Sequence, residues 1–406
     1  MPKIALHWQI LIALLAGAAS GLLLGPTVLH VAFIGTLFLK ALKMIIVPLI
    51  ATSIITGIAG AGRTEKVGSL GVRTFAYYLS TSLLAIITGL VLVNLIEPGV
   101  GADLGLQQKP EKLQASLNEF GDSPGEAVER LLLDMVPTNP FKAMAEGEIL
   151  QLIVFSLLFG FFATRIPQPY SESIIGFFQA AFETMMKLTQ FIMRLAPIGI
   201  FALVAKMVAS TGFAPFADLA LYALTVICGL AFHSLVTLPL ILSLVARRSP
   251  RRHSQAMAPA LLTAFSTSSS SATLPLTIDS LEQRAKISNR TTSFVIPLGA
   301  TINMDGTALY ECVAAMFIAQ AYGVDLGPAQ QFLVVVTALL ASIGAAGIPM
   351  AGLVMISVIL TAVGLPLEGL GLILAVDRVL DMCRTTVNVW SDSCGAAVVE
   401  ASTQKG

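Results

Sequence analysis

The sequence predicts an all-α polytopic membrane protein with eight transmembrane helices and two re-entrant helical hairpins. The first observation is composition: of the 406 residues, 55% are hydrophobic and 12% are charged, whereas soluble domains carry roughly 25% charged residues. The second is the recurrence of apolar runs of about 20 residues, the length that crosses a bilayer. The third is that two later apolar stretches are interrupted at mid-length, which leaves arms too short to cross. We therefore expect a lipid bilayer around the chain.

Net charge and cysteine usage argue against a nucleic-acid-binding protein and against a cysteine metal site. The chain has 24 basic and 24 acidic residues, so it lacks the basic surface that nucleic acid requires, and we expect no nucleic-acid partner. The four cysteines lie in apolar segments without the spacing of a metal site, and we interpret them as small buried hydrophobic residues. They are Cys228, Cys312, Cys383 and Cys394.

The first part of the chain predicts six spans, at residues 8–29, 31–60, 68–97, 137–165, 172–210 and 217–247. The N-terminal run resembles a cleaved signal peptide, but the many spans that follow favour a retained first helix. Residues 98–136 are rich in acidic residues, glycine and proline, which predicts a polar extracellular excursion that leads into the fourth span.

Basic residues outside the spans predict the orientation. Arg63, Lys66 and Arg73 lie between the second and third spans, and a run from Arg247 to His253 follows the sixth. Positive charge concentrates in cytoplasmic loops, and an even number of crossings separates the two groups. We therefore expect a multi-pass protein of the cell membrane with both termini in the cytoplasm.

The residues after Arg252 predict the first re-entrant hairpin, at about 251–283. An apolar arm, MAPALLTAFST, precedes the serine run SSSS, and a second arm, ATLPLTIDSL, follows it. Each arm has about half the length of a crossing helix, so the segment would enter and leave on the cytoplasmic side. The alternatives are a low-complexity linker or a simple kink.

A second interrupted element predicts another hairpin, at about 329–364. The run GAAGIPMAG breaks the apolar sequence there, although an ordinary extracellular turn is the alternative. One helix, about 287–322, lies between the hairpins, and another, about 367–403, follows them. Two hairpin–helix units of opposite orientation are inverted repeats, which are typical of transporters with a binding site at the repeat interface.

The last helix carries a polar face. At about 100° per residue, five polar or charged positions fall within about 80° of one another. They are Asp377, Asp381, Arg384, Asn388 and Asp392. Charged groups at bilayer depth cost about 2.5–3.5 kcal/mol each on insertion scales, so they must face protein, water or ions. The face suits a zwitterionic ligand and cations, and a structural ladder of ion pairs is the alternative.

The preceding helix contains PLGATINMDGTALYE, Pro297 to Glu311. Its cluster of poor helix formers predicts local unwinding, which frees oxygen atoms for cations. Asn303 and Asp305 are the candidate side-chain ligands, and a packing kink is the alternative. Glu311 is a candidate proton carrier, because an ionised acid is unfavourable there; a neutral, hydrogen-bonded glutamic acid is the alternative.

Four motifs together resemble the dicarboxylate/amino acid:cation symporter family, which includes excitatory amino-acid transporters and archaeal aspartate transporters. The motifs are SSSSATLPLT, NMDGTALYE, AAGIPMAGLVM and LDMCRTTVNV with Asp392 beyond it, and they occur in the family's order. The resemblance implies a homotrimer that works as an elevator. Residues 1–67 and 137–212 would form the scaffold, whereas 68–97 and 213–406 would form the transport domain, with the excursion 98–136 between them.

The resemblance also implies a substrate site. Arg384 would hold the side-chain carboxylate, Asp381 the α-amino group, and Asn388 with the backbone of Ser270 the α-carboxylate. The pocket would be completed by Thr307, Thr385, Ser268, Ile348 and Gly352.

Three sodium sites are implied in the same way, with Na⁺ as the coupling ion and no organic cofactor. One would use Asp392, Asn388 and carbonyls of Gly299 and Asn303. A second would use carbonyls of Thr301, Met304, Ser342, Ile343 and Ala345. A third would combine Asp305 and Asn303 with Tyr78, Thr81 and Ser82.

The sequence departs from the family pattern at several positions. Ser268 and Met382 stand where archaeal and mammalian members, respectively, place an arginine. Met350 occupies a position that is usually glycine, serine or glutamine, and Trp390 and Ser391 replace smaller residues.

These features predict secondary active symport of L-glutamate or L-aspartate, coupled to Na⁺, with H⁺ uptake and K⁺ export left open. Arg384 argues against a neutral amino-acid carrier, and Asp381 argues against a C4-dicarboxylate carrier. Both remain alternatives, as does a substrate-gated anion channel. An enzyme is not expected, because none of the four histidines lies within the motifs to serve the serine run as a base.

Overall fold

The computed structural model describes residues 6–62, 68–102, 133, 136–146, 148–211, 214–344, 351–365 and 369–403. Every regular element in these ranges is a helix, which confirms the predicted all-α class. The excursion predicted at 98–136 lies almost wholly outside the described residues.

The first three predicted spans appear within a few residues of their expected bounds. They are α1 (Leu6–Leu24), α2 (Ala32–Gly62) and α3 (Gly68–Ile96), with the 3₁₀ helix η1 (Gly25–Val31) between α1 and α2. Gly25 has a φ of 52°, a left-handed conformation that glycine adopts easily, so the α-helix ends here and the chain turns into α2.

The fourth and fifth spans are each divided. The fourth comprises α6 (Pro140–Glu146) and α7 (Ile149–Ala163). The span predicted at 172–210 is not one straight helix: the structure has α8 (Gln168–Arg194) and α9 (Ala196–Thr211), bent by 51°. The bend coincides with Pro197, which lacks an amide hydrogen and whose ring clashes with the preceding turn of a continuous helix.

The sixth span is continuous but contains a turn of wider helix. It consists of α10 (Ala214–Phe232), the π-helical turn η2 (His233–Thr237) and α11 (Leu238–Leu244). Such turns occur often at functional sites.

The first predicted hairpin has the expected local shape. It comprises α12 (Pro250–Thr267), α13 (Ser270–Asp279) and the π turn η3 (Ser280–Arg284), and α12 packs against α13. Only two residues join the arms. Ser268 is left-handed, with φ 51°, and Ser269 is extended and accepts a hydrogen bond from the amide of Ala272 at 3.2 Å. That cap begins the second arm.

The remaining elements follow the predicted order. The helix at 287–322 is broken into α14 (Asn289–Ile302) and α15 (Asp305–Ala321), which confirms the predicted unwinding. The second hairpin has the packed arms α16 (Pro328–Gly344) and α17 (Ala351–Ala362), while its tip, 345–350, lies outside the described residues. The last helix, α18 (Leu370–Thr403), has 34 residues.

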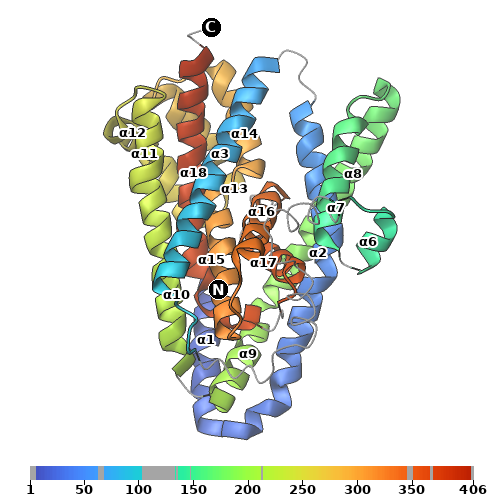
Figure 1. Cartoon of the computed structure of the whole chain (residues 1–406), viewed down its shortest axis with the longest axis vertical. Coiled ribbons are helices and arrows are strands. Elements are labelled where there is room, and N and C mark those ends of the chain that lie inside the picture. Colours follow the sequence, from blue (N-terminus) through green and yellow to red (C-terminus); the bar gives the residue numbers. More distant parts are fainter. Residues whose placement is uncertain are drawn as a thin grey trace, which may run out of the picture.

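The helices form two groups (Figure 1). The first helix group comprises α1, α2 and α6–α9, and the second comprises α3 and α10–α18. In the figure, α2, α7 and α8 stand apart from α3, α10, α11, α14, α15 and α18, with α16 and α17 between them. An apolar cluster joins the groups, with Ile54 and Leu152 from the first and Met304, Ala341 and Met355 from the second.

Length and hydropathy identify fewer spans than predicted. Among the described residues, three stretches meet both criteria, or four if the bent pair α8–α9 is counted as one. Broken and charged helices such as α14 and α18 fail such a test although they belong to the same bundle. The count of eight spans therefore stays a prediction.

Candidate functional site

The predicted polar face of α18 is buried inside the second helix group. Asp377 and Arg384 are fully buried, and Asp381, Asn388 and Asp392 are at most 5% exposed. The helix packs against α12, α14 and α15, so this face meets protein rather than lipid. The remaining turns of α18 are largely apolar, so the helix can be buried with these charges facing its neighbours.

Arg384 lies at the centre of a charged cluster. Its Nη2 donates to Asp381 at 2.8 Å and lies 3.1 Å from Asp377. Its guanidinium carbon stands 3.7 Å from the centroid of the Tyr310 ring, whose hydroxyl donates to Asp377 at 2.6 Å. Arg378, off the main face, lies 3.7 Å from Asp381. The ion-pair ladder weighed from the sequence is therefore present.

The cluster nevertheless leaves hydrogen-bonding groups unused. Within the described part of the chain, Nε and Nη1 of Arg384 and Oδ2 of Asp377 have no hydrogen-bond partner. A buried donor or acceptor without a partner is unfavourable, which is typical of a site that awaits a ligand. Gly352 of α17 lies against Nη1, where a side chain would collide with the guanidinium.

A second set of contacts joins α18 to the start of α15. The Oδ1 atom of Asn388 accepts from the amide of Gly306 at 2.8 Å, and its Nδ2 donates to Thr307 at 3.2 Å. Thr385, one helical turn away on α18, is buried as well. The structure thus brings together six of the predicted substrate residues: Arg384, Asp381, Asn388, Thr385, Thr307 and Gly352.

The first hairpin contributes two predicted residues. Ser268 and Ser270 are buried at the junction of α12 and α13, and the hydroxyl of Ser268 has no hydrogen-bond partner among the described residues. Neither side chain is joined by a hydrogen bond to the α18 face in the part that the structure describes. Ile348 lies outside the described residues.

Asp305 forms the most densely bonded carboxylate of the site. Its Oδ1 accepts from Ser82 at 2.7 Å and from Thr81 at 3.3 Å, both on α3. Its Oδ2 accepts from Ser391 at 2.6 Å and lies 3.1 Å from Nε2 of His233. The predicted contact between the polar residues of α3 and Asp305 is therefore present. Ser391, noted above as a departure from the family pattern, also binds this carboxylate.

Asp392 and Asn303 meet beside this carboxylate. The Nδ2 of Asn303 donates to Asp392 at 2.8 Å and to Ser391 at 3.1 Å, whereas its buried Oδ1 has no partner among the described residues. Tyr78 and Asp392 both lie against Gly299, where any side chain would collide with them. A carboxylate, a free amide oxygen and closely approached backbone are the donors that hard cations prefer.

The predicted second sodium site is only partly described. Met304 and Ser342 are buried, whereas Thr301 is exposed and donates its hydroxyl to the carbonyl of Leu298 at 2.9 Å. Ile343 lies within α16, but its side chain is outside the described residues, as is Ala345. Among the described residues no cluster of three or more His, Cys, Asp or Glu side chains could hold a metal.

Glu311 is fully buried on α15, next to Tyr310. Neither carboxyl oxygen has a hydrogen-bond partner among the described residues, so the hydrogen-bonded alternative weighed from the sequence is not what the structure shows.

Sequence reasoning missed His233 and Tyr310. His233 belongs to no motif and reaches Asp305 only because the π turn η2 packs against α3 and α18. The available signal was a histidine within an apolar span, where polar groups are costly and usually functional. Tyr310 lies inside the motif NMDGTALYE, but no role was predicted for it. Trp390 points away from Asp392 and donates to the carbonyl of Ser234 at 3.1 Å.

Comparison with known proteins gives matches along almost the whole chain. A sequence model described as the sodium:dicarboxylate symporter family matches residues 6–402. Excitatory amino acid transporter 3 of Mus musculus is 40% identical over 453 residues, covering 98% of this chain and 86% of the relative. The proton/glutamate-aspartate symporter of Escherichia coli is 37% identical, covering 98% and 92%. An excitatory amino acid transporter of Caenorhabditis elegans is 38% identical, covering 93% and 83%.

Proposed function

The chain belongs to the sodium:dicarboxylate symporter family, and on this premise we propose that it carries L-glutamate or L-aspartate across a membrane in symport with Na⁺. The family and the relatives named above are transporters, not enzymes. The observation that carries the substrate class is the buried Arg384 between two aspartates, with free donors of its own.

Substrate binding would exchange one set of ion pairs for another. Without substrate, Arg384 pairs with Asp381 and Asp377. An acidic amino acid brings a side-chain carboxylate for Arg384, whose planar guanidinium favours carboxylates, and an ammonium group for Asp381. Each buried charge would keep a partner throughout, which matters because an unpaired buried charge is strongly destabilising. The α-carboxylate would then meet Asn388 and the start of α13.

Two cation sites are supported by the packing of α3, α14, α15 and α18. One would use Asp305 and Asn303 with Tyr78, Thr81 and Ser82, and the other Asp392, Asn388 and carbonyls of Gly299 and Asn303. A cation would compensate the negative charge that Asp305 and Asp392 concentrate. Glu311 would carry a proton, the ion named for the Escherichia coli relative, and potassium export is the further alternative.

Two helix groups support an elevator arrangement. The first helix group would be the scaffold of a homotrimer, and the second would move within the membrane with substrate and cations enclosed. The apolar cluster between the groups suits a sliding contact, and the two packed helix pairs, α12–α13 and α16–α17, would serve as re-entrant gates. We place the protein in the cell membrane with both termini in the cytoplasm.

Uptake into proteoliposomes tests the proposal. Radiolabelled L-aspartate and L-glutamate should accumulate against their gradients when Na⁺ is high outside, and Arg384→Ala should abolish this uptake. The same variant should retain or gain uptake of neutral amino acids, because it loses the carboxylate partner but keeps Asp381. Accumulation of succinate but of neither amino acid would instead favour a C4-dicarboxylate carrier. Substrate-dependent anion flux without accumulation would favour a channel.

A further inference from the structure

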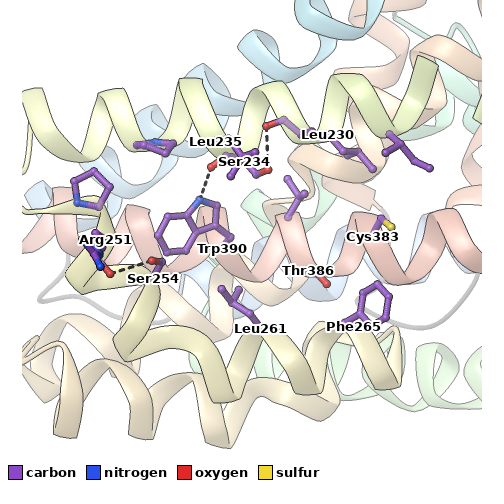
Figure 2. A pocket seen from close by; sticks show the side chains of 15 residues that line it. Leu230, Ser234, Leu235, Arg251, Ser254, Leu261, Phe265, Cys383, Thr386 and Trp390 are labelled. Carbon is purple, nitrogen blue, oxygen red and sulfur yellow. Dashed lines mark hydrogen bonds between the residues drawn. The ribbon is translucent and has the colours of Figure 1, made fainter. Parts of the chain in front are cut away.

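An apolar cavity of about 650 Å³ lies between α10–α11, α12 and α18, on the side of α18 away from the charged cluster. Its walls are mostly hydrophobic, among them Leu230, Leu235, Leu261, Phe265 and Val387. Figure 2 shows the lining side chains between these helices, with Trp390 on the α18 wall between the two ends.

The cavity is separate from the substrate and cation sites. Cys383, Thr386, Val387 and Trp390 line it from α18. At about 100° per residue, Cys383, Thr386 and Trp390 fall on the face opposite Asp381, Arg384 and Asn388, and Val387 lies at the edge between the two faces. One helix therefore presents ionic groups on one side and a hydrocarbon surface on the other.

One end of the cavity is polar and basic. Figure 2 shows Arg251 and Ser254 at this end and Phe265 and Cys383 at the other. The Ser254 hydroxyl donates to the carbonyl of Arg251, so it is satisfied within α12. Of the described lining residues, Arg251 alone carries a charge. It is exposed and has no ion-pair partner among the described residues. Arg247 and Arg252, both exposed, add positive charge nearby.

We propose that this cavity binds one acyl chain of an anionic phospholipid of the bilayer, whose headgroup phosphate is held by Arg251. Family membership places these helices in a membrane, where a cavity with apolar walls is filled by hydrocarbon rather than water. Basic pockets between transmembrane helices bind anionic headgroups, and guanidinium groups suit phosphate oxygens. The cavity has an apolar body and a single cationic end, which is the complement of such a lipid.

Tryptophan fluorescence can test occupancy directly. The chain has two tryptophans, so Trp8→Phe leaves Trp390 in the cavity wall as the sole reporter. This variant would be reconstituted in vesicles with increasing fractions of brominated phosphatidylglycerol or brominated phosphatidylcholine, since bromine quenches tryptophan at short range. Brominated phosphatidylglycerol should reach half-maximal quenching at a clearly lower mole fraction than brominated phosphatidylcholine.

Matched arginine variants test the headgroup contact. In the single-tryptophan background, Arg251→Gln should raise the half-quenching fraction of brominated phosphatidylglycerol roughly fivefold, the factor expected for one arginine near a membrane surface. Arg251→Lys keeps the positive charge and should show a smaller rise in this fraction than Arg251→Gln. Arg252→Gln removes the same charge from an exposed neighbour outside the cavity lining and should change little.

Three outcomes would overturn the proposal. Equal quenching by both lipids would mean that the cavity takes hydrocarbon without choosing the headgroup. Absence of quenching by either would mean that no acyl chain enters. If Arg251→Gln and Arg252→Gln raised the half-quenching fraction of brominated phosphatidylglycerol equally, the preference for this lipid would come from diffuse surface charge. The readout requires no substrate, so its failure is distinguishable from failure of the proposed transport.

Discussion

His233 and Asp305 meet at 3.1 Å although 72 residues separate them in the chain. Both are fully buried. His233 and Ser391 together hold Oδ2 of Asp305, which directs Oδ1 towards Thr81 and Ser82 on α3. We interpret His233 as a positioning residue: it would orient the carboxylate of Asp305, the proposed cation ligand, without touching the cation itself.

Replacing His233 should therefore weaken cation binding specifically. His233→Ala should raise the half-saturating Na⁺ concentration roughly 10–100-fold, the usual effect of removing a partner of a metal ligand. His233→Gln, which keeps an amide donor of similar reach, should recover most of the loss. Sodium titration of thermal stability measures binding without transport. A merely structural histidine would lower stability equally with and without Na⁺, and the glutamine variant would not recover the sodium response.

At the scale of residues, the sequence predicted which side chains of α18 share a buried face, but not which residues of other helices contact that face. A helix of known period places Asp377, Asp381, Arg384, Asn388 and Asp392 on one face, whatever the fold, and the structure confirms that face. The partners supplied by other helices, such as His233 and Tyr310, depend on packing angles that local pattern does not contain. Ser268 and Ser270 at the junction of the first hairpin were identified by their motif. The side chains that they contact could not be predicted from it.

Close helix packing is the main feature at the scale of elements. At Gly352 and Gly306, α17 and α15 approach α18 so closely that a side chain would collide with Arg384, with its guanidinium at the first and its carbonyl oxygen at the second. Glycine is needed at both positions because α17 and α15 leave no room for a Cβ atom beside Arg384. One arm of the second hairpin, α17, thereby limits the position of the Arg384 guanidinium.

Gly352→Ala should consequently impair substrate recognition. The added methyl group would push the guanidinium from its place over Tyr310, so we expect the KM for L-aspartate to rise at least tenfold while the half-saturating Na⁺ concentration changes little. Gly57→Ala is the control, because a side chain at this α2 position meets nothing within 4 Å. Uptake kinetics of both variants provide the measurement. An unchanged KM in Gly352→Ala would show that Arg384 is not held by this contact.

Element boundaries were predictable where helix-breaking residues cluster. The serine run and the NMDG sequence each indicated a break, and the structure ends α12 at Thr267 and α14 at Ile302. The bend between α8 and α9 was missed because its apolar run continues across Pro197 with no polar residue beside the proline. The π turn at His233–Thr237 carries no equivalent signal, since its residues would also suit an ordinary helix.

At the scale of the whole molecule, cation binding should stabilise the second helix group as a unit. The candidate sites draw on α3, α14, α15 and α18, elements from distant parts of the chain. A ligand that binds only the folded state adds about 2.7 kcal/mol at one hundred times its Kd. Sodium chloride should therefore raise the Tm relative to choline chloride at equal ionic strength.

Asp305→Asn should remove much of this sodium-dependent rise in Tm, because it removes the carboxylate charge. Asp325→Asn, at an exposed position after α15, should keep the full rise. Thermal unfolding in detergent, followed by intrinsic fluorescence, would measure both. A rise that survives in Asp305→Asn would show that the cation binds elsewhere, whereas a rise with choline as well would show a general salt effect.

The depth of each helix in the bilayer and the assembly of copies could not be predicted from local pattern. Both depend on surfaces that the chain presents to lipid and to other copies, and apolar residues serve either purpose. The division into two helix groups follows from the helix contacts: α1 and α2 both pack against α9, whereas α3 and α18 both pack against α14 and α15. That partition is visible in the structure although no linker in the sequence marks it.

The ion pairs around Arg384 have a consequence for the return half of a transport cycle. A carrier that delivers its cargo must recross the membrane empty, and any charge left without a counter-charge would make that journey unfavourable. Arg378 and Arg384 are matched by Asp377 and Asp381, so this group of four is electrically neutral when nothing is bound. These four groups thus supply their own counter-ions when no substrate is bound, and a variant that unbalances them should slow the return of the carrier without substrate most of all.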